Sequence, residues 1–189
     1  MQPGEVAQVA KQMLGSKIIT KQTGPEGKPV SKIYLCERRY IRRETYIAIT
    51  LDRVSGGPVV IASPKGGVDI ETLAVEEPET VLRLPIDIDT GMDDEQALKI
   101  AEHLLFKGNL RQEAAEQLKK LYQLFTSKDA TLIEVNPFVE TSDGHVLCLD
   151  AKLNFDANAM YRQNDLSQMA DYSQMDPREE KATKHDLNY

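Results

Sequence analysis

Three oxygen-bearing side chains, Glu134, Asn136 and Asp150, are the residues of this sequence whose types and spacing best suit chemistry. Glu134 and Asn136 alternate with apolar residues, which is the period-two pattern of a half-buried strand. A second alternating run, residues 145–153, contains Asp150 and follows a glycine-containing turn sequence at residues 141–144. The segment therefore predicts a β-hairpin that carries its polar side chains on one face.

The register of this hairpin follows from its turn, because opposed residues of an antiparallel pair are equally far from the centre of the turn. Asn136 with Asp150, and Glu134 with Lys152, are both centred on Asp143, so a symmetric hairpin places the Cβ atoms of Asn136 and Asp150 about 5 Å apart. An amide oxygen and a carboxylate at that separation suit Mg²⁺, which keeps several waters and takes other ligands from phosphate. A structural alternative stays open here: Asn136 is a turn residue and Asp150 a charge at a strand edge.

Composition excludes several classes of protein. Of the 189 residues, 41% are hydrophobic, which is enough for a folded core. Thirty acidic and 23 basic residues give a net charge of -7, which argues against nucleic acid or an anionic membrane as the main partner, since both require a basic surface. No apolar stretch has the length of a membrane span, and no signal or transit pattern opens the sequence. Cys36 and Cys148 stand in apolar runs, which predicts buried, reduced thiols.

The remaining patterns predict an α+β fold in which helices pack on an antiparallel sheet. Apolar residues at helical spacing predict helices at residues 6–14, between the N-cap Asp93 and Gly108, and at residues 111–127. Alternating or short apolar runs predict a meander of strands at residues 33–36, 45–53 and 58–63. Residues 68–91 are expected to form a long irregular connection, and the chain after residue 158 is polar.

Two further segments carry groups that suit phosphate. The run Ser-Pro-Lys-Gly-Gly at residues 63–67 follows a predicted strand, so its backbone amides can receive phosphate, although it is neither a Walker loop nor a Rossmann fingerprint. The arginines of residues 37–44 can steer an anionic nucleotide, or form a solvated, salt-bridged surface with the glutamates beside them. The three histidines have no neighbouring nucleophile or second ligand, so no histidine-based catalytic site is expected in this chain.

Several ordered motifs are together more specific than any one short pattern: residues 21–24 (Lys-Gln-Thr-Gly), 36–44, 66–71 (Gly-Gly-Val-Asp-Ile-Glu), 133–137 (Ile-Glu-Val-Asn-Pro), 148–159 and 176–179 (Asp-Pro-Arg-Glu). They resemble the ATP-grasp domain of the β subunit of succinyl-CoA synthetase (succinate–CoA ligase), and the similarity extends over essentially all 189 residues. Residues 36–44 look most like the ADP-forming mitochondrial type. The resemblance implies a partial ATP-grasp fold in residues 1–160, whose N-terminal part is missing, and a polar segment, residues 161–189, that leads towards an absent C-terminal CoA-ligase domain.

The resemblance also implies roles for the hairpin residues. Asn136 and Asp150 fall on the family's Mg²⁺ ligands. Glu134 falls on an acidic residue that approaches the phosphohistidine of the partner α subunit, and is thus the expected catalytic residue of this chain.

Four other positions fall on the family's nucleotide site. Cys36 and Glu37 match the hinge strand whose backbone meets the adenine, and Glu44 matches a nucleotide-contacting glutamate. Arg39 matches the entrance that tunes nucleotide choice. Cys36 stands where bacterial members have glutamate, so a side-chain contact there is not carried over.

The implied activity is the tricarboxylic acid cycle reaction of succinyl-CoA, phosphate and ADP (or GDP) to succinate, CoA and ATP (or GTP) in the mitochondrial matrix. Mg²⁺ and the nucleotide bind to this segment, whereas CoA and succinate bind through regions outside it, so the segment alone is expected to be inactive. Two alternatives remain: another ATP-grasp ligase, such as a malate–CoA or carboxylate–amine ligase, or a non-catalytic nucleotide-binding module.

Overall fold

The computed structural model describes residues 3–20 and 23–169, together with residues 171, 178, 181–182, 185 and 187. The chain divides into two compact units, one of residues 1–38 and 165–189 and one of residues 39–164. Within the described ranges, no helix is both long and apolar enough to cross a membrane.

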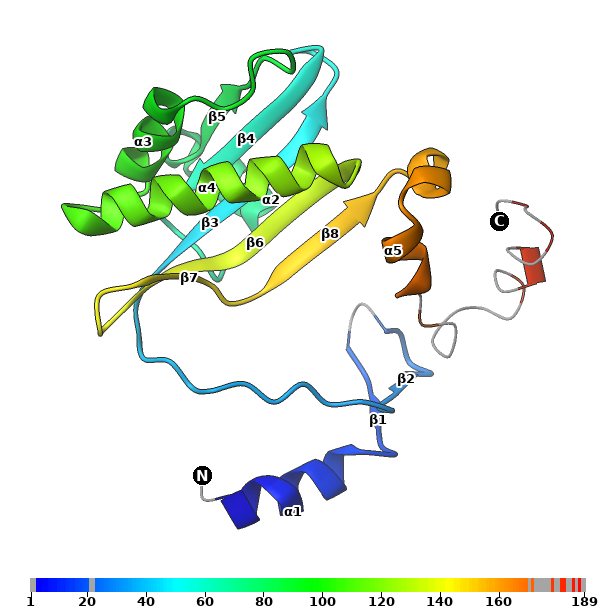
Figure 1. Cartoon of the computed structure of the whole chain (residues 1–189). Coiled ribbons are helices and arrows are strands. Elements are labelled where there is room, and N and C mark those ends of the chain that lie inside the picture. Colours follow the sequence, from blue (N-terminus) through cyan, green and yellow to red (C-terminus); the bar gives the residue numbers. More distant parts are fainter. Residues whose placement is uncertain are drawn as a thin grey trace. The chain divides into compact units, whose positions relative to one another are not determined.

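The unit of residues 39–164 is built on a six-stranded antiparallel sheet of order β5-β4-β3-β6-β7, in which β8 also pairs with β6 (Figure 1). Its strands are β3 (Ile41–Asp52), β4 (Gly57–Ser63), β5 (Leu82–Pro85), β6 (Ala130–Thr141), β7 (Val146–Cys148) and β8 (Ala151–Phe155). The predicted strands at residues 45–53 and 58–63 are confirmed as the β3–β4 hairpin. The longest strands, β3 and β6, lie side by side in the middle of the sheet.

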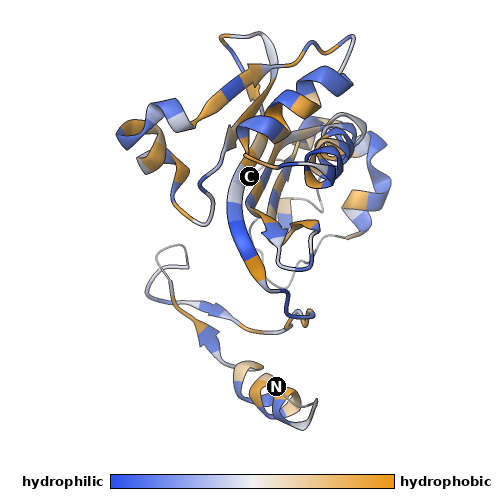
Figure 2. Cartoon of the chain, turned by 90° about the vertical axis from the view of Figure 1, so that its left-hand side faces the viewer, coloured by the Kyte–Doolittle hydropathy of each residue, from blue (hydrophilic) through white to orange (hydrophobic). Residues whose placement is uncertain are grey.

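Two helices, α3 (Asp94–His103) and α4 (Asn109–Ser127), cover one face of this sheet (Figure 1). Their apolar stripes meet the inward side chains of β3, β4 and β6 in one core, which includes Ile47, Ile133 and Leu118 at 0% exposure. Figure 2 shows the pattern behind this packing: apolar stretches along the strands, and alternating polar and apolar bands along the helices. The two predicted helices and their role as core are therefore confirmed.

The connection between α3 and α4 differs from the prediction. The helix ends at His103 rather than at Gly108, because Leu105 adopts a left-handed φ of 63° and its side chain is 57% exposed. Gly108, with a φ of 56°, is instead the residue that precedes α4. The helical spacing of apolar residues in the sequence therefore extends beyond the last residue of the helix in the structure.

Residues 68–91, expected to be irregular, contain three regular elements. These are α2 (Ile70–Glu76), the 3₁₀ helix η1 (Pro78–Thr80) and β5. The helix α2 begins at Asp69, whose side chain accepts a hydrogen bond from the backbone of Glu71, and Leu73 is its buried residue. A helix of two turns with one buried position has too little periodicity to be recognised in the sequence.

The strand predicted at residues 33–36 is wrong, since the described residues 30–38 belong to no strand. Tyr34 and Leu35 are 91% and 74% exposed there. A short apolar run forms a strand only if a neighbouring strand supplies hydrogen bonds. No described strand pairs with residues 33–36. The prediction of buried thiols fails for the same reason at Cys36, which is exposed. Cys148, at the end of the short strand β7, is exposed as well, although partial burial raises the pKa of its thiol.

The unit of residues 1–38 and 165–189 contains the predicted first helix, α1 (Pro3–Met13), which is followed by Gly15 at a φ of 81°. The strands β1 (Lys17–Ile18) and β2 (Lys28–Pro29) pair after it. After residue 158 the chain forms the 3₁₀ helix η2 (Ala157–Arg162), which belongs to the sheet unit, and α5 (Asn164–Gln168). The boundary expected at residue 160 stays a prediction, as does the motif at residues 176–179, which lies almost wholly outside the described residues.

Candidate functional site

The hairpin that was expected to carry the chemistry has the predicted register. Glu134 lies opposite Lys152 in the β6–β8 pair, and Phe138 lies opposite Cys148 in the β6–β7 pair. Between these pairs, the backbone N–H of Asn136 donates to the carbonyl oxygen of Asp150 at 3.2 Å. Asn136 of β6 therefore lies opposite Asp150, which stands in the short break between β7 and β8.

The neighbouring strand β3 adds two polar residues to the same face. Ala48 pairs with Glu134, so Tyr46 and Glu44, at two-residue intervals along β3, share its face. The pairing shifts between Thr45 and Ile47, so that β6 has one residue more than β3 beside Tyr46. This bulge lies next to Asn136, and bulges of this kind re-aim side chains. The face is the one opposite α3 and α4.

Tyr46 is the buried centre of this group, with 4% of its surface exposed. Burial raises the pKa of its hydroxyl well above the ordinary value, and the charge of Glu134, hydrogen bonding with Glu134 and the charge of Glu71 raise it further. The hydroxyl therefore stays protonated at neutral pH. Glu71 belongs to α2, so the charge of that helix also acts on the Tyr46 hydroxyl.

Asn136 fastens a glycine loop, residues 66–68, to strand β6. Its Oδ1 accepts a hydrogen bond from the N–H of Gly67 at 2.7 Å, and its Nδ2 donates to the carbonyl oxygen of Val68 at 3.1 Å. Both ends of the carboxamide are thus used by the loop. The Oδ1 atom keeps one lone pair for another partner.

The other amides of the run at residues 63–67 are also bonded within the protein. The N–H of Lys65 donates to Ser63 Oγ at 3.2 Å, and that of Gly66 donates to the carbonyl oxygen of Glu44 at 3.1 Å. The Lys65 ammonium donates to the Glu77 carboxylate at 2.6 Å. The hypothesis that this run receives phosphate through its amides is therefore wrong for this conformation, because the donors already have acceptors.

The donor set suits Mg²⁺. Asn136 offers an amide oxygen and Asp150 an exposed carboxylate, and both are hard oxygen ligands. No group of three His, Cys, Asp or Glu side chains that could hold a metal occurs among the described residues. Two protein oxygens with the remaining shell completed by water and phosphate is the usual way in which proteins bind Mg²⁺.

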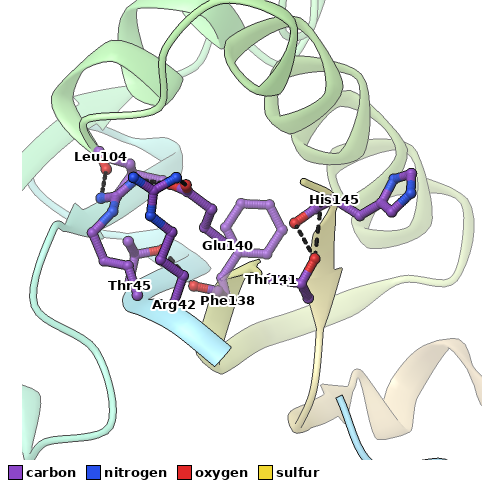
Figure 3. A network of polar contacts seen from close by, with 8 residues as sticks. Arg42, Thr45, Leu104, Phe138, Glu140, Thr141 and His145 are labelled. Carbon is purple, nitrogen blue, oxygen red and sulfur yellow. Dashed lines mark hydrogen bonds and ion pairs between the residues drawn. The ribbon is translucent and has the colours of Figure 1, made fainter. Parts of the chain in front are cut away.

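The arginines before and at the start of β3 divide into two kinds. Arg42 and Arg43 bind the two oxygens of Glu140 at 3.0 Å and 3.2 Å, and the Glu140 side chain is only 10% exposed (Figure 3). Arg43 also donates to the carbonyl oxygen of Leu104, and its guanidinium lies 4.8 Å from the centre of the Phe106 ring. The salt-bridged alternative is therefore correct for Arg42 and Arg43, which join β3, β6 and the end of α3.

The remaining predicted nucleotide-site residues lie elsewhere in the chain. Arg39 is exposed, with its guanidinium 3.6 Å from the carboxylate of Asp143 in the hairpin turn. Cys36 and Glu37 are exposed and belong to the other compact unit. The structure thus brings together Glu44, Glu134, Asn136 and Asp150 on one sheet, while the roles of Cys36, Glu37 and Arg39 stay predictions.

Sequence reasoning missed one member of the site, Tyr46, and gave another, Gly67, only as part of a candidate phosphate-binding run. Tyr46 had a usable signal, since it stands two residues after Glu44 on a predicted strand. The actual contacts of Gly67 had no signal in the sequence, because they come from Glu44 and from Asn136, the latter 69 residues away. A cavity of about 720 Å³ beside Met92, Leu98 and Tyr122, between α3 and α4, shares no residue with this site.

A family described as the ATP-grasp domain matches residues 1–140 of the chain. The chain belongs to the ATP-grasp family. The antiparallel sheet with helices packed on it is the α+β ATP-grasp fold that the sequence predicted. Among solved structures, this ATP-grasp chain is similar to ATP citrate lyase from Methanothrix soehngenii in complex with citrate and coenzyme A, with a TM-score of 0.60. That similarity covers 89% of this chain and 37% of the other at 19% identity, and it supports the fold alone.

Curated relatives are more similar in sequence. The ATP-grasp chain is 49% identical over 187 residues to the ADP-forming succinate–CoA ligase subunit β, mitochondrial, of Columba livia. It is 52% identical over 187 residues to the GDP-forming subunit β of the same organism, also mitochondrial. These alignments cover 99% of the chain but 45% and 48% of the relatives, so the chain spans about half of their length. The ADP-forming and GDP-forming types match about equally well.

Proposed function

We propose that this chain is the nucleotide- and Mg²⁺-binding part of the β subunit of a succinate–CoA ligase. The observation that carries the proposal is the hairpin register, which opposes Asn136 and Asp150 and puts Glu134 on the same face. The identity of about half of all residues with the β subunits of such ligases supports it. The proposed reaction is that of the tricarboxylic acid cycle, in which succinyl-CoA, phosphate and ADP or GDP give succinate, CoA and ATP or GTP.

The site residues have separate roles in this proposal. Asn136 and Asp150 hold Mg²⁺, which when bound neutralises charge on the nucleotide phosphates. Glu134, as an anion, orients and stabilises the imidazolium of a phosphorylated histidine that the partner α subunit presents. Tyr46, buried and protonated, lies beside Glu134.

The nucleotide is contacted by Glu44, by the backbone at Cys36 and Glu37, and near Arg39. We propose the ADP-forming type for this chain, on the similarity of residues 36–44 to that type. CoA and succinate bind through regions outside this chain. The relatives are named as mitochondrial proteins, which supports the proposal that the ligase works in the mitochondrial matrix.

The decisive experiment replaces Glu134 by glutamine in the complete ligase subunit assembled with its α partner. We expect phosphorylation of the partner's histidine by Mg²⁺·ATP, followed in single turnovers, to slow by roughly 100-fold or more, because the amide has no charge to stabilise the imidazolium. The dissociation constant for Mg²⁺·ATP should change little. Glu79→Gln, an exposed carboxylate of η1, is the matched control and should phosphorylate at the wild-type rate.

The same preparation separates the alternative functions. Turnover with succinate but not with malate or an amine acceptor supports the proposed ligase. Turnover with another acceptor would reassign the substrate, and nucleotide binding without any turnover would make the chain a non-catalytic module.

A further inference from the structure

Gly67 lies so close to Glu44 that a side chain at position 67 would displace the Glu44 carboxylate from its present place. A Cβ atom built on Gly67 would collide with Oε2 of the Glu44 carboxylate. A Cβ atom on the neighbouring Gly66 would collide with the backbone of Thr45. The two glycines therefore let the loop touch the beginning of β3 on the face opposite α3 and α4, with the Glu44 carboxylate directly beside Gly67.

The loop cannot simply move away from Glu44, because it is bonded on both sides. On one side the N–H of Gly66 donates to the Glu44 carbonyl oxygen at 3.1 Å. On the other side the Asn136 carboxamide bonds Gly67 and Val68 at 2.7 Å and 3.1 Å. The φ of Gly67, 68°, is a left-handed conformation that a residue with a side chain adopts only at a cost.

We propose that Gly67 and Asn136 are positioning residues for Glu44: Asn136 fastens the 66–68 loop to β6, and Gly67 leaves the space in which the Glu44 carboxylate lies. This inference rests on the proposed function, in which Glu44 contacts the nucleotide. In this proposal the glycine run leaves space for a carboxylate and does not bind phosphate. Its amides are bonded within the protein, which is consistent with that role. A side chain that keeps this position when the nucleotide binds loses less conformational freedom than one that must move to reach it.

The contact itself is tested by stability, independently of any activity. Gly56, in the β3–β4 turn, has a φ of 70° and nothing within 4 Å of an added Cβ, so Gly56→Ala carries the same backbone strain without the collision. We expect Gly67→Ala to lower the melting temperature by about 2 °C beyond Gly56→Ala, because the Glu44 carboxylate must leave its place. In a Glu44→Ala background this excess should disappear. An excess of the same size in both backgrounds would overturn the proposal.

The consequence for binding is tested by calorimetric titration of the complete subunit complex with Mg²⁺·ADP. Gly67→Ala should weaken binding by about tenfold, as Glu44→Ala does, and the double variant should be no weaker than either single variant. If Glu44→Ala weakens binding and Gly67→Ala does not, the positioning role is wrong while the proposed function stands. If Glu44→Ala has no effect, the nucleotide role of Glu44 fails, whatever the stability experiment shows.

A second variant keeps the test independent of how well Gly67→Ala folds. Asn136→Ala adds no bulk but removes both hydrogen bonds to the loop. Measured without metal or nucleotide, amide hydrogen exchange at Gly67 should speed up by about tenfold or more in this variant. Asn154→Ala, an exposed asparagine on β8, should leave it unchanged. Equal exchange in the wild type and Asn136→Ala would show that Asn136 does not hold the loop.

Discussion

At the scale of single residues, Asn136 combines two demands on one side chain. Its Oδ1 accepts from Gly67 and, in the proposed function, also faces a metal with its second lone pair, while its Nδ2 is needed by Val68. An aspartate would serve a metal at least as well but could not donate to Val68. The amide at this position is therefore explained by the loop and not by the metal alone.

The carboxylate opposite it has no such second task. Asp150→Asn preserves shape but removes the negative charge that faces the proposed Mg²⁺, so we expect kcat of the assembled ligase to fall by at least about tenfold, with the free energy of unfolding nearly unchanged. Titration with Mn²⁺ followed by electron paramagnetic resonance should show weaker metal binding. The hairpin turn offers a poor control, because Asp143 contacts Arg39. Asp89→Asn, in an exposed loop, is the better one; equal losses in both variants would contradict the metal assignment.

At the scale of elements, the helix α3 is defined by its first turn. The Asp93 side chain accepts from the N–H of Gln96 at 2.7 Å, and the Gln96 side chain accepts from the N–H of Asp93 at 3.2 Å, which completes a capping box. This box fixes where α3 begins, and the helix that follows contributes Ala97, Ile100 and Ala101 to the core.

Removal of the cap tests that dependence. We expect Asp93→Ala to reduce the free energy of unfolding by about 1 kcal/mol, since the N–H groups of the first turn lose their acceptor. Asp93→Ser retains an acceptor and should recover most of the loss. Urea denaturation followed by circular dichroism measures both variants, and identical stability of the alanine variant and the wild type would show that the box contributes nothing.

At the scale of the whole sheet unit, Asp129 joins segments that are far apart in sequence. Its carboxylate accepts from Arg162 Nε at 2.8 Å and from Gln163 Nε2 at 2.8 Å, and it ties the α4–β6 junction to the end of η2. The hydrogen bonds from Arg162 and Gln163 lower the pKa of Asp129 from 3.8 to about 2. Its φ of 51° is left-handed, a conformation that asparagine also tolerates.

The lowered pKa gives a pH dependence of defined sign. Because the folded protein binds this proton less readily than the unfolded chain, the contribution to stability is complete above pH 4 and is lost as the pH falls from about 4 to about 2. Asp129→Asn should lose this contribution at neutral pH and show a flatter acid limb in urea melts recorded between pH 2 and 5. Arg162→Gln should flatten the same limb. An unchanged slope in both variants would refute the role of this ion pair.

The sequence by itself determined what depends on neighbours along the chain. The hairpin register followed from the turn around Asp143, the α3 cap from Asp93 and Gln96, and the buried stripes of α3 and α4 from helical spacing. Local pattern suffices there because a turn or a cap is formed by residues a few positions apart. The resemblance of ordered motifs indicated the family in the same way, without any knowledge of contacts.

Only the tertiary structure decided which acceptors the loop amides meet and which strands have partners. The run at residues 63–67 looked free to bind phosphate, yet its donors are satisfied by Ser63, Glu44 and Asn136, the last of them on a strand about 70 residues away. The apolar run at residues 33–36 looked like a strand but has no partner among the described residues. Hydrogen-bond satisfaction and strand pairing depend on groups brought together from distant positions, and no local pattern in the sequence contains that information.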